Sequence, residues 1–570
     1  MAFKRMDGPH YFLNLKEASS QRFEVELRFI PQMQRLKLQL PVWTPGSYLE
    51  RAYSRHLEGI TALQGSTTLK LKRFSSDAWL LEVQPQISVI VKYTLLAVTE
   101  SVRTNWLDHN HGFLTAAAWA LEVEGQRWLS HRVSLDLPND WQVATSLTKC
   151  AANTFSATNF DQFLDSPLAL GHFSELVFEV GGVPHRWVWQ GLIQAAPIDQ
   201  WRWQLTILCR SVCKLLGVEK PPTNSYLFLI RFCDQGYGGL EHTDNTALIF
   251  SRNDLKTSEG QRRLLQLVAH EYLHQWNIKR IRPQELRPYN YSDETIFPTL
   301  WFAEGVTSYY DSILVLRAGL CSELDYLKDL AKEISRYRLT PGKRIQSLEQ
   351  SSEEAWVKLY RRDSHSDNQQ ISYYLKGQLV ALMLDLHLLA IGSSLQALLR
   401  EMWKIYGIQE RGYTQQDLIN ISATFDSSLF TLLPAWLEET TDLGLEEQLK
   451  SVGMNLLADN NTQAYSGINL ASCGAELRIN MVDRNSPAES ACLYAGDEIL
   501  AIDNVRCKTI DYFEKNLNVD QIHTLIVSHD GLVQKRELIP QMPQPKAWSL
   551  TIDENVVAEI INRRQLWLHG

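Results

Sequence analysis

Hydrophobic positions in the first 190 residues recur in short runs, several of which alternate with polar positions. Turn signals such as Pro45-Gly46 and Gly181-Gly182 separate these runs. Alternation with a period of two predicts β-strands, and residues 178–180 and 185–189 face each other across Gly181-Gly182 as a hairpin. We therefore expect a sandwich of antiparallel strands. The clearest runs are residues 22–30, 36–40, 87–98 and 176–180.

The pattern changes near residue 195, where apolar positions take up the period of a helix. Residues 198–216 predict a helix, whereas 225–232 and 247–250 predict buried strands. A sheet followed by a helical half is an α+β arrangement. Further predicted helices are 261–277, 300–318, 323–337, 374–390, 395–405, 415–425 and 430–450. After residue 455 short strands are predicted again, at 476–482, 498–502 and 523–528.

Length and composition are those of an ordinary globular chain. Its 570 residues suggest about three or four domains. Hydrophobic residues make up 45% and charged residues 21%, so large cores can be buried. The formal net charge of -9 argues against a general nucleic-acid binder, which needs a basic excess to neutralise phosphates. No nucleic-acid partner is expected.

Three features bear on the compartment. The richest apolar stretch, residues 379–391, is interrupted by Asp385 and His387, so no membrane span is predicted. The N-terminal sequence MAFKRMDGPHYFLNL lacks the apolar segment of a secretory signal. The eight cysteines are scattered without a CxxC pair, which is typical of reduced thiols. We expect a soluble, cytoplasmic protein.

The sequence His270-Glu271-Tyr272-Leu273-His274 is an H-E-x-x-H motif inside the predicted helix 261–277. Positions i and i+4 share one face of a helix, so both imidazoles can reach one metal ion. Glu271 would lie beside the metal and act as the general base toward a bound water. The alternative is an amphipathic surface helix with two solvated histidines.

A third candidate ligand, Glu304, stands within an apolar run from Ile296 to Val315. A buried carboxylate without a partner is costly, and a metal ion would be a suitable partner. Two histidines and one glutamate, with the fourth position left for water, form a catalytic zinc site. We therefore predict one Zn²⁺ per chain, held by His270, His274 and Glu304.

Three sequences resemble the glycyl aminopeptidase family of PDZ-domain-containing zinc metallopeptidases: HEYLHQWN from His270, WFAEGVTSYY from Trp301 and WTPGSY from Trp43. That family is a distant relative of the aminopeptidase N and leukotriene A4 hydrolase group. The resemblance implies a multidomain fold with an N-terminal β-sandwich, a thermolysin-like α+β catalytic domain whose C-terminal half is mainly helical, and a PDZ domain. The expected domains are 1–192, 193–455 and 456–545, with a C-terminal extension at 546–570.

The segment from Tyr237 to His242 follows the predicted strand 225–232. Taken alone, its Gly-Gly pair indicates a turn. In the relatives of this family, a glycine-rich edge strand pairs with the substrate backbone and its glutamate holds the free α-amine. The resemblance gives that role to Glu241, although the aminopeptidase N group usually has Asn where this chain has His242. The substrate-binding residues that it implies are Gly238, Gly239, Leu240, Glu241 and His242.

Two tyrosines, Tyr373 and Tyr374, stand at the start of a predicted helix and precede Lys376-Gly377. The pattern is similar to a Tyr-x-Lys-Gly sequence in the same relatives, whose tyrosine hydroxyl donates to the tetrahedral oxyanion. By register Tyr374 is the match, with Tyr373 as the alternative. A pair of packed aromatic rings explains the same residues without a catalytic role.

Three cations, Lys279, Arg280 and Arg282, follow the metal helix. The helix dipole favours cations at a C-terminus, which is a sufficient cause. Binding of a substrate carboxylate is the alternative.

The order of motifs from Ser466 to Asp503 resembles a protease-associated PDZ domain. The Ser486-Pro487-Ala488 stretch would begin a short helix, and the sequence from Gly496 would enter a strand. Such domains add an extended peptide to a sheet edge and capture its C-terminal carboxylate with backbone amides. The loop for this would be Gly467, Ile468, Asn469 and Leu470. The alternative is a module that only packs against the catalytic body.

Together these residues predict a zinc aminopeptidase that hydrolyses the N-terminal bond of peptides with a free N-terminus. The resemblance implies a preference for small residues such as Gly or Ala. Two alternatives stay open: an inactive scaffold that binds a peptide or protein C-terminus through its PDZ domain, and a zinc endopeptidase. Complete ligands and an intact Glu271 argue against the first, and Glu241 argues against the second.

Overall fold

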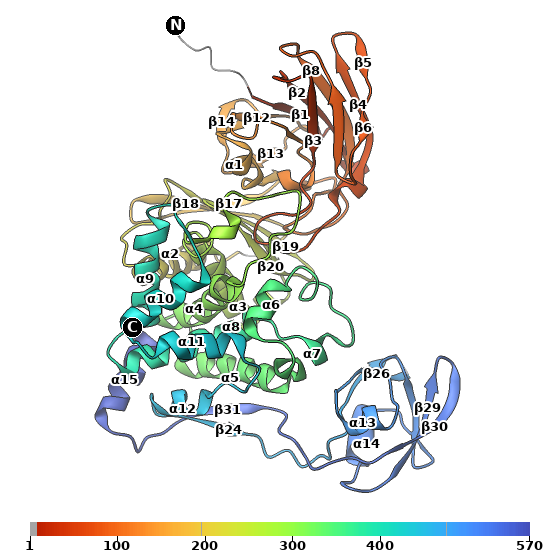
Figure 1. Cartoon of the computed structure of the whole chain (residues 1–570), viewed down its shortest axis with the longest axis vertical. Helices are drawn as coiled ribbons and strands as arrows, with labels where there is room; N and C mark the ends of the chain where they lie inside the picture. The colour runs from red at the N-terminus through yellow and green to blue at the C-terminus, as the bar shows by residue number, and fades with distance from the viewer. Residues whose placement is uncertain (1–7, 195, 475) are drawn as a thin grey trace. The chain divides into compact units, whose positions relative to one another are not determined.

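The computed structural model describes residues 8–194, 196–474 and 476–570 (Figure 1). Residues 1–7 lie outside this range. They are part of the N-terminal sequence MAFKRMDGPHYFLNL, for which we predicted no secretory signal. The chain divides into two compact units. The first holds residues up to 296 together with 310–320 and 399–414, and the second holds 297–309, 321–398 and 415–570.

The N-terminal part of the first unit consists of β-sheets. In β2 (Arg22–Phe29) alternate residues such as Phe23, Val25 and Leu27 are buried, as the period of two predicts. The largest sheet has eight strands in the order β14-β15-β12-β1-β2-β8-β4-β5, and two four-stranded sheets have the orders β13-β16-β10-β9 and β11-β3-β7-β6. The pair β1 and β12 is parallel, so the expectation of wholly antiparallel strands was wrong. Parallel pairing needs a long connection, which the intervening strands provide.

The bounds of these strands are β1 (His10–Asn14), β3 (Arg35–Gln39), β4 (Leu57–Gln64), β5 (Thr67–Leu69), β6 (Lys72–Arg73), β7 (Ala78–Glu82), β8 (Val89–Leu96), β9 (Trp106–Leu107), β10 (His111–Leu114), β11 (Glu122–Val123), β12 (His131–Asp136), β13 (Gln142–Ala144), β14 (Thr148–Ala151), β15 (Thr154–Ala157) and β16 (Leu168–Gly171). A short helix, α1 (Phe160–Leu164), precedes β16.

The first unit continues with a five-stranded sheet in the order β17-β18-β19-β21-β20. The predicted hairpin is confirmed, since β17 pairs with β18 in antiparallel register. However, β18 also pairs in parallel with β19, so this sheet begins before residue 193, where we expected the catalytic domain to begin. β20 lies at the edge of the sheet. The bounds are β17 (Ser174–Val180), β18 (Val183–Gln190), β19 (Tyr226–Cys233), β20 (Tyr237–Glu241) and β21 (Asn245–Ser251).

Two helices of the first unit contact each other, α2 (Ile198–Leu215) and α3 (Ser258–Leu273). We expected the second to continue to residue 277, but it ends at Leu273 with His274 as its C-cap. The chain then turns back on itself, with Ile278 at a φ of 98° and a bridge between Asn277 and Ile281. This turn stops the helix directly after the motif.

The second unit is mainly helical. Its helix α8 (Tyr373–Ala390) is buried along nearly its whole length, which explains its continuous apolar sequence. The stretch 430–450 was expected as one helix but forms two, α11 (Leu429–Glu438) and α12 (Leu445–Lys450). Thr440, Thr441 and Gly444 lie between them, and such residues are weak helix formers. The second unit also holds α5 (Glu323–Leu339), α6 (Leu348–Glu353), α7 (Ser366–Gln369) and α10 (Gln415–Phe425), while α4 (Val306–Arg317) and α9 (Leu395–Met402) have residues in both units.

A C-terminal module follows, with a six-stranded sheet and its own core around Leu477, Ile499 and Leu525. The three strands predicted there are confirmed. Its elements are β25 (Ile468–Cys473), β26 (Glu476–Val482), α13 (Pro487–Ser490), β27 (Glu498–Ile502), β28 (Val505–Arg506), α14 (Ile510–Lys515), β29 (His523–His529) and β30 (Leu532–Leu538). That this module is a PDZ domain stays a prediction.

The segment after the module returns to the helical part of the second unit. β31 (Trp548–Ile552) pairs with β24 (Met454–Ala458), and α15 (Ala558–His569) contacts α8. The C-terminal module is therefore inserted between two paired strands. Within the described residues no single helix is long and apolar enough to cross a membrane, although the bent pair Tyr373–Ala390 and Leu395–Gly407 would meet that test jointly. The chain is multidomain, with an N-terminal β-sheet domain and a helical C-terminal half.

Candidate active site

The helix α3 presents both motif histidines on one side. It begins where the Thr257 side chain accepts a hydrogen bond from the Gly260 amide, at 3.0 Å. The rings of His270 and His274 lie 4.7 Å apart at 86°, as their spacing of four residues predicts. His274 is buried and His270 is partly exposed. The surface helix with two solvated histidines is therefore not what the chain forms.

Each imidazole is oriented through its Nδ1 atom. Nδ1 of His270 lies 3.0 Å from the Asp311 carboxylate, and Nδ1 of His274 lies 2.8 Å from the Asn277 carbonyl oxygen. Both partners accept hydrogen bonds, so Nδ1 is the protonated atom of each neutral ring and Nε2 keeps its lone pair. A histidine that binds a metal through one ring nitrogen typically donates a hydrogen bond from the other nitrogen to a carboxylate or carbonyl oxygen, as both rings do here.

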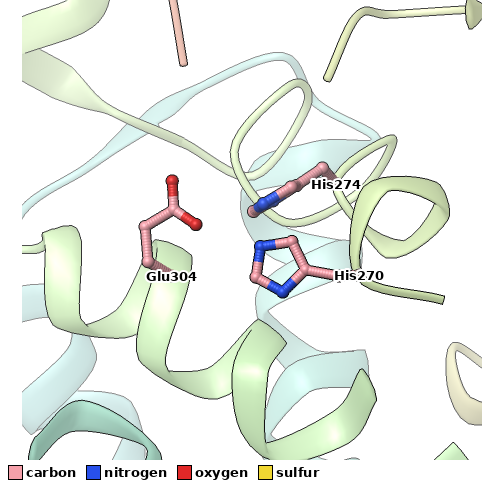
Figure 2. Close-up of side chains that lie close together, drawn as sticks. All are labelled: His270, His274 and Glu304. Atoms are coloured by element: carbon pink, nitrogen blue, oxygen red, sulfur yellow. The ribbon is translucent and has the colours of Figure 1, made fainter. Parts of the chain in front are cut away.

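Glu304 lies in a π-helical turn, Trp301–Gly305, that leads into α4. Such turns are frequent at functional sites because they redirect side chains. Glu304 is 1% exposed. One ligand atom from each of His270, His274 and Glu304 lies within 4.8 Å of the others, and Figure 2 shows the two rings and the carboxylate converging. Two imidazoles and one carboxylate are a donor set that zinc accepts, so these residues could hold it.

Glu271 lies directly against the edge strand β20. A Cβ atom added to Gly239 would stand 2.1 Å from Oε1 of Glu271. The strand and the carboxylate therefore come close because residue 239 has no side chain. Glu271 is itself buried, at 4% exposure. This places the expected general base beside the expected substrate-binding strand, within one unit of the structure.

The polar groups of β20 alternate in direction. The amide of His242 donates to the carbonyl of Asn245 on β21, at 3.0 Å, so the backbone groups of Gly239 and Glu241 point to the open edge of the sheet. The segment expected as either a turn or an edge strand is thus an edge strand. Glycine is favoured at positions 238 and 239 for different reasons. At Gly238 the backbone has a φ of +148°, and at Gly239 the side chain of Glu271 fills the space that a Cβ atom would need.

The carboxylate of Glu241 is met by the loop that carries the WTPGSY sequence. A Cβ atom on Gly46 would stand 2.5 Å from its Oε2, and the φ of +88° at Gly46 also favours glycine. Trp43 anchors this loop by donating from Nε1 to the Asn290 carbonyl, at 2.7 Å. Two segments far apart in sequence therefore meet at Glu241.

His242 belongs to a buried ionic cluster with Asp165 and Lys279. Nδ1 of His242 lies 3.0 Å and Nζ of Lys279 lies 2.7 Å from the same carboxylate oxygen. Burial alone would raise the pKa of Asp165, but the charges of Lys279 and His242 outweigh it and hold the pKa well below its usual range. Burial alone would lower the pKa of Lys279, but the charge of Asp165 raises it. This cluster supports the strand end next to Glu241.

The other two cations that follow α3, Arg280 and Arg282, also have structural partners. Arg280 donates to the carbonyls of Pro222, Thr243 and Gln275, at 2.7, 3.1 and 2.8 Å. Arg282 donates to the Lys279 carbonyl at 2.9 Å and stacks over Tyr289. These bonds brace the turn after α3, so a substrate carboxylate is not needed to explain the three cations.

Tyr374 lies in the first turn of α8, where Ser372 caps the helix. Its ring stacks on that of Tyr373 at 4.7 Å, and the Tyr360 hydroxyl lies 3.3 and 3.2 Å from the hydroxyls of Tyr373 and Tyr374. Burial and the charge of Glu304 raise the pKa of Tyr374 well above its usual value, so the hydroxyl keeps its proton. Tyr373 is fully buried whereas Tyr374 is partly exposed, which favours Tyr374 as the residue that meets a substrate.

In the C-terminal module, Gly467 precedes β25 and has a φ of +75°. Ile468, Asn469 and Leu470 lie in β25 itself. All four residues line a cavity of about 1000 Å³ together with residues of α5 and α14. The expected peptide loop therefore borders open space, and peptide binding there stays a prediction.

Comparisons with known protein families match the segments that contain the three motifs described above. A model of the M61 glycyl aminopeptidase family matches residues 263–380, and a model of the peptidase M61 N-terminal domain matches residues 10–172. The first range contains the metal residues and Tyr374, and the second contains the WTPGSY sequence. No curated protein matches this chain.

Among solved structures, an aminopeptidase N family protein from Idiomarina loihiensis is 29% identical and has a TM-score of 0.92, covering 99% of this chain and 100% of that one. The M1 zinc metallopeptidase from Deinococcus radiodurans is 13% identical with a TM-score of 0.49, over 78% of this chain and 96% of that one. Yeast leukotriene A4 hydrolase in complex with bestatin is 12% identical with a TM-score of 0.46, over 78% and 69%.

The fold is that of the aminopeptidase N family protein from Idiomarina loihiensis. The sequence matches the M61 glycyl aminopeptidase family over residues 10–172 and 263–380, and these matches support a peptidase.

Three residues near the site, Asp311, Arg103 and Asp165, belong to none of the motifs and were not predicted from the sequence. Asp311 is two helical turns after Glu304, which is the one local hint of its place. Arg103, which contacts Gly239, and Asp165, which pairs with Lys279, are separated from their partners by 136 and 114 positions. Only the folded chain brings them together.

Proposed function

We propose that this protein is a zinc-dependent aminopeptidase that hydrolyses the N-terminal bond of peptides and favours small residues such as Gly or Ala. The observation that carries the proposal is the arrangement on β20. Glu241 and Gly239 face the open edge of the sheet, and the expected base Glu271 packs against Gly239. A peptide paired with this edge would have its α-amine at one carboxylate and its first peptide bond near the other.

In this proposal His270, His274 and Glu304 hold the zinc ion, which when bound supplies a Lewis acid that polarises the carbonyl and acidifies water. Glu271 accepts the proton of the attacking water and returns it to the leaving amine. Glu241 binds the α-ammonium group of the substrate. The Tyr374 hydroxyl donates to the oxyanion of the tetrahedral species, and its raised pKa keeps that proton available.

The preference for small residues rests on the loop above Glu241. The backbone of Gly46 lies so close to the Glu241 carboxylate that even a methyl group on Gly46 would overlap it. One side of the amine-binding carboxylate is therefore covered by main chain. This leaves less room for the first side chain than a fully open carboxylate would.

The test is release of the N-terminal residue from glycyl and alanyl peptides with a free or an acetylated amine. The wild type is compared with Glu271→Gln and with Glu259→Gln, an exposed glutamate on the same helix. We expect cleavage of the free-amine peptides alone, its loss in Glu271→Gln and on chelation of zinc, and no loss in Glu259→Gln. Cleavage of acetylated peptides would indicate an endopeptidase. Absence of cleavage despite bound zinc would indicate the scaffold alternative.

A further inference from the structure

Arg103 places a guanidinium group beside the substrate-binding strand. Its main chain is fixed on both sides: the Tyr53 hydroxyl donates to the Arg103 carbonyl at 2.8 Å, and the Arg103 amide donates to Ser101 Oγ at 3.2 Å. Its Nη2 donates to the Gly239 carbonyl at 2.8 Å. Arg103 thus reaches the open edge of β20 from the N-terminal domain, 136 positions away in sequence.

The charge of Arg103 has no carboxylate partner within the part of the chain that the structure describes. The side chain is half-buried, and its Nε atom is buried without a hydrogen-bond partner. A cation taken partly out of water without an anion is costly. Its one bond, to a neutral carbonyl, leaves the charge without a counter-ion, whereas a carboxylate would supply both a counter-ion and two parallel hydrogen bonds. An anionic ligand would complete this site.

The arrangement of the proposed active site indicates where that anion comes from. Glu241 binds the α-amine, and Glu271 acts at Gly239, so a bound peptide runs from Glu241 toward Gly239. The two positions are about 7 Å apart on an extended strand, which corresponds to two residues of a paired peptide. The second or third residue of the substrate therefore arrives beside Gly239 and Gly238.

The space at this point is open on the side of Arg103. A Cβ atom added to Gly238 would have Nη1 of Arg103 as its nearest neighbour, at 4.0 Å. Nη1 and Nη2 lie at the end of the side chain, where a guanidinium binds a carboxylate through two parallel hydrogen bonds. Lysine could not reproduce that geometry, because its charge is a single point.

We propose that Arg103 binds the C-terminal carboxylate of dipeptide and tripeptide substrates, so that the enzyme prefers short peptides with a free carboxyl end. This inference rests on the proposed aminopeptidase function. Glu241 and Arg103 hold the two charged ends of a short peptide, and the first peptide bond lies between them. Longer peptides extend past Arg103 and gain nothing from it.

The experiment compares alanyl-alanine and trialanine with their C-terminal amides, and a six-residue alanine peptide with its amide. The enzymes are the wild type, Arg103→Met, Arg103→Lys and Arg22→Met. Arg22 is an exposed arginine of the same domain with a surface ion pair to Glu58, at 3.6 Å, and a hydrogen bond to the Ser20 carbonyl, at 3.4 Å. Alanyl 4-nitroanilide, which has no carboxylate, reports the basal aminopeptidase activity of every variant.

For the wild type and Arg22→Met we expect kcat/KM for the short acids to exceed that for the amides by about 10- to 100-fold, mostly through KM. Arg103→Met should bring this ratio close to one and leave the acid-to-amide ratio of the six-residue pair at its wild-type value, while the nitroanilide rate of each variant normalises any general change in activity. Arg103→Lys should retain part of the ratio. An equal ratio in the wild type and Arg103→Met would show that Arg103 only braces β20, and would overturn the proposal.

Binding without turnover separates this inference from the proposed function. Calorimetry with the zinc-loaded Glu271→Gln variant measures the affinities of trialanine and its amide, with and without Arg103→Met. Tighter binding of the acid that depends on Arg103 supports the site even if the wild type cleaves no peptide. Equal affinities for acid and amide overturn it even if the wild type is an active aminopeptidase.

Discussion

The contact between Gly239 and Glu271 allows the proposed catalytic geometry to be perturbed by a single methyl group. In Gly239→Ala the new Cβ atom would stand 2.1 Å from Oε1 of Glu271, whereas ordinary contact begins at about 3.4 Å. The Glu271 side chain must therefore shift, its Oε1 by about 1.3 Å, because its Cδ and Cγ would also be too close, at 2.3 and 2.6 Å, and the strand is held by β21. Misplacement of a reacting group by about 1 Å costs about 100-fold in rate.

We expect kcat for an alanyl peptide to fall about 100-fold in Gly239→Ala, which corresponds to about 2.7 kcal/mol of activation free energy. The variant should still bind zinc, because the substitution touches none of His270, His274 and Glu304. It should also fold, since alanine in a strand is no worse than glycine where φ is compatible. Kinetics, zinc content and the thermal unfolding temperature measure these three properties.

Gly444→Ala is the matched control, because a Cβ atom at Gly444 meets nothing within 4 Å. It should keep its activity and its unfolding temperature. A Gly239→Ala enzyme with activity within about threefold of the wild type would refute the reasoning, because Glu271 would then not act from the position seen here. Loss of zinc together with activity would also refute it, since the damage would lie in the metal site.

Two further predictions concern the metal and the pH dependence of stability. Asp311→Asn should weaken zinc binding about 10- to 100-fold in a chelator competition, because the partner of His270 loses its charge, while Asp199→Asn on the surface should not. Burial lowers the pKa of Lys376 from 10.5 to about 8. Protonation in the folded state thus costs about 3 kcal/mol below pH 8, and this cost disappears as pH rises toward 10.5. Lys376→Met should therefore unfold at a higher temperature than the wild type at pH 7, by an amount that shrinks at pH 10. A gap that grows with pH would contradict the sign.

The helix that carries the candidate metal ligands could be predicted from sequence because its geometry is local. A helix repeats every 3.6 residues, so the spacing of His270 and His274 alone puts both rings on one face. The isolated carboxylate of Glu304 in an apolar run was a second local signal. The alternating strands and most helices follow from the same periodicity. The break between α11 and α12 was missed because apolar periodicity continued across weak helix formers.

Tertiary structure alone decided which distant segments meet. The parallel pairing of β1 with β12 and of β18 with β19 depends on strand order, which the period along one strand does not encode. Gly46 meets Glu241, and Arg103 meets Gly239, because folding brings separate strands and loops to one sheet edge. Sequence determined the residue types and the local faces of this site. The charged surroundings of β20 were set by contacts between residues more than one hundred positions apart, because only packing of the whole unit brings them within reach.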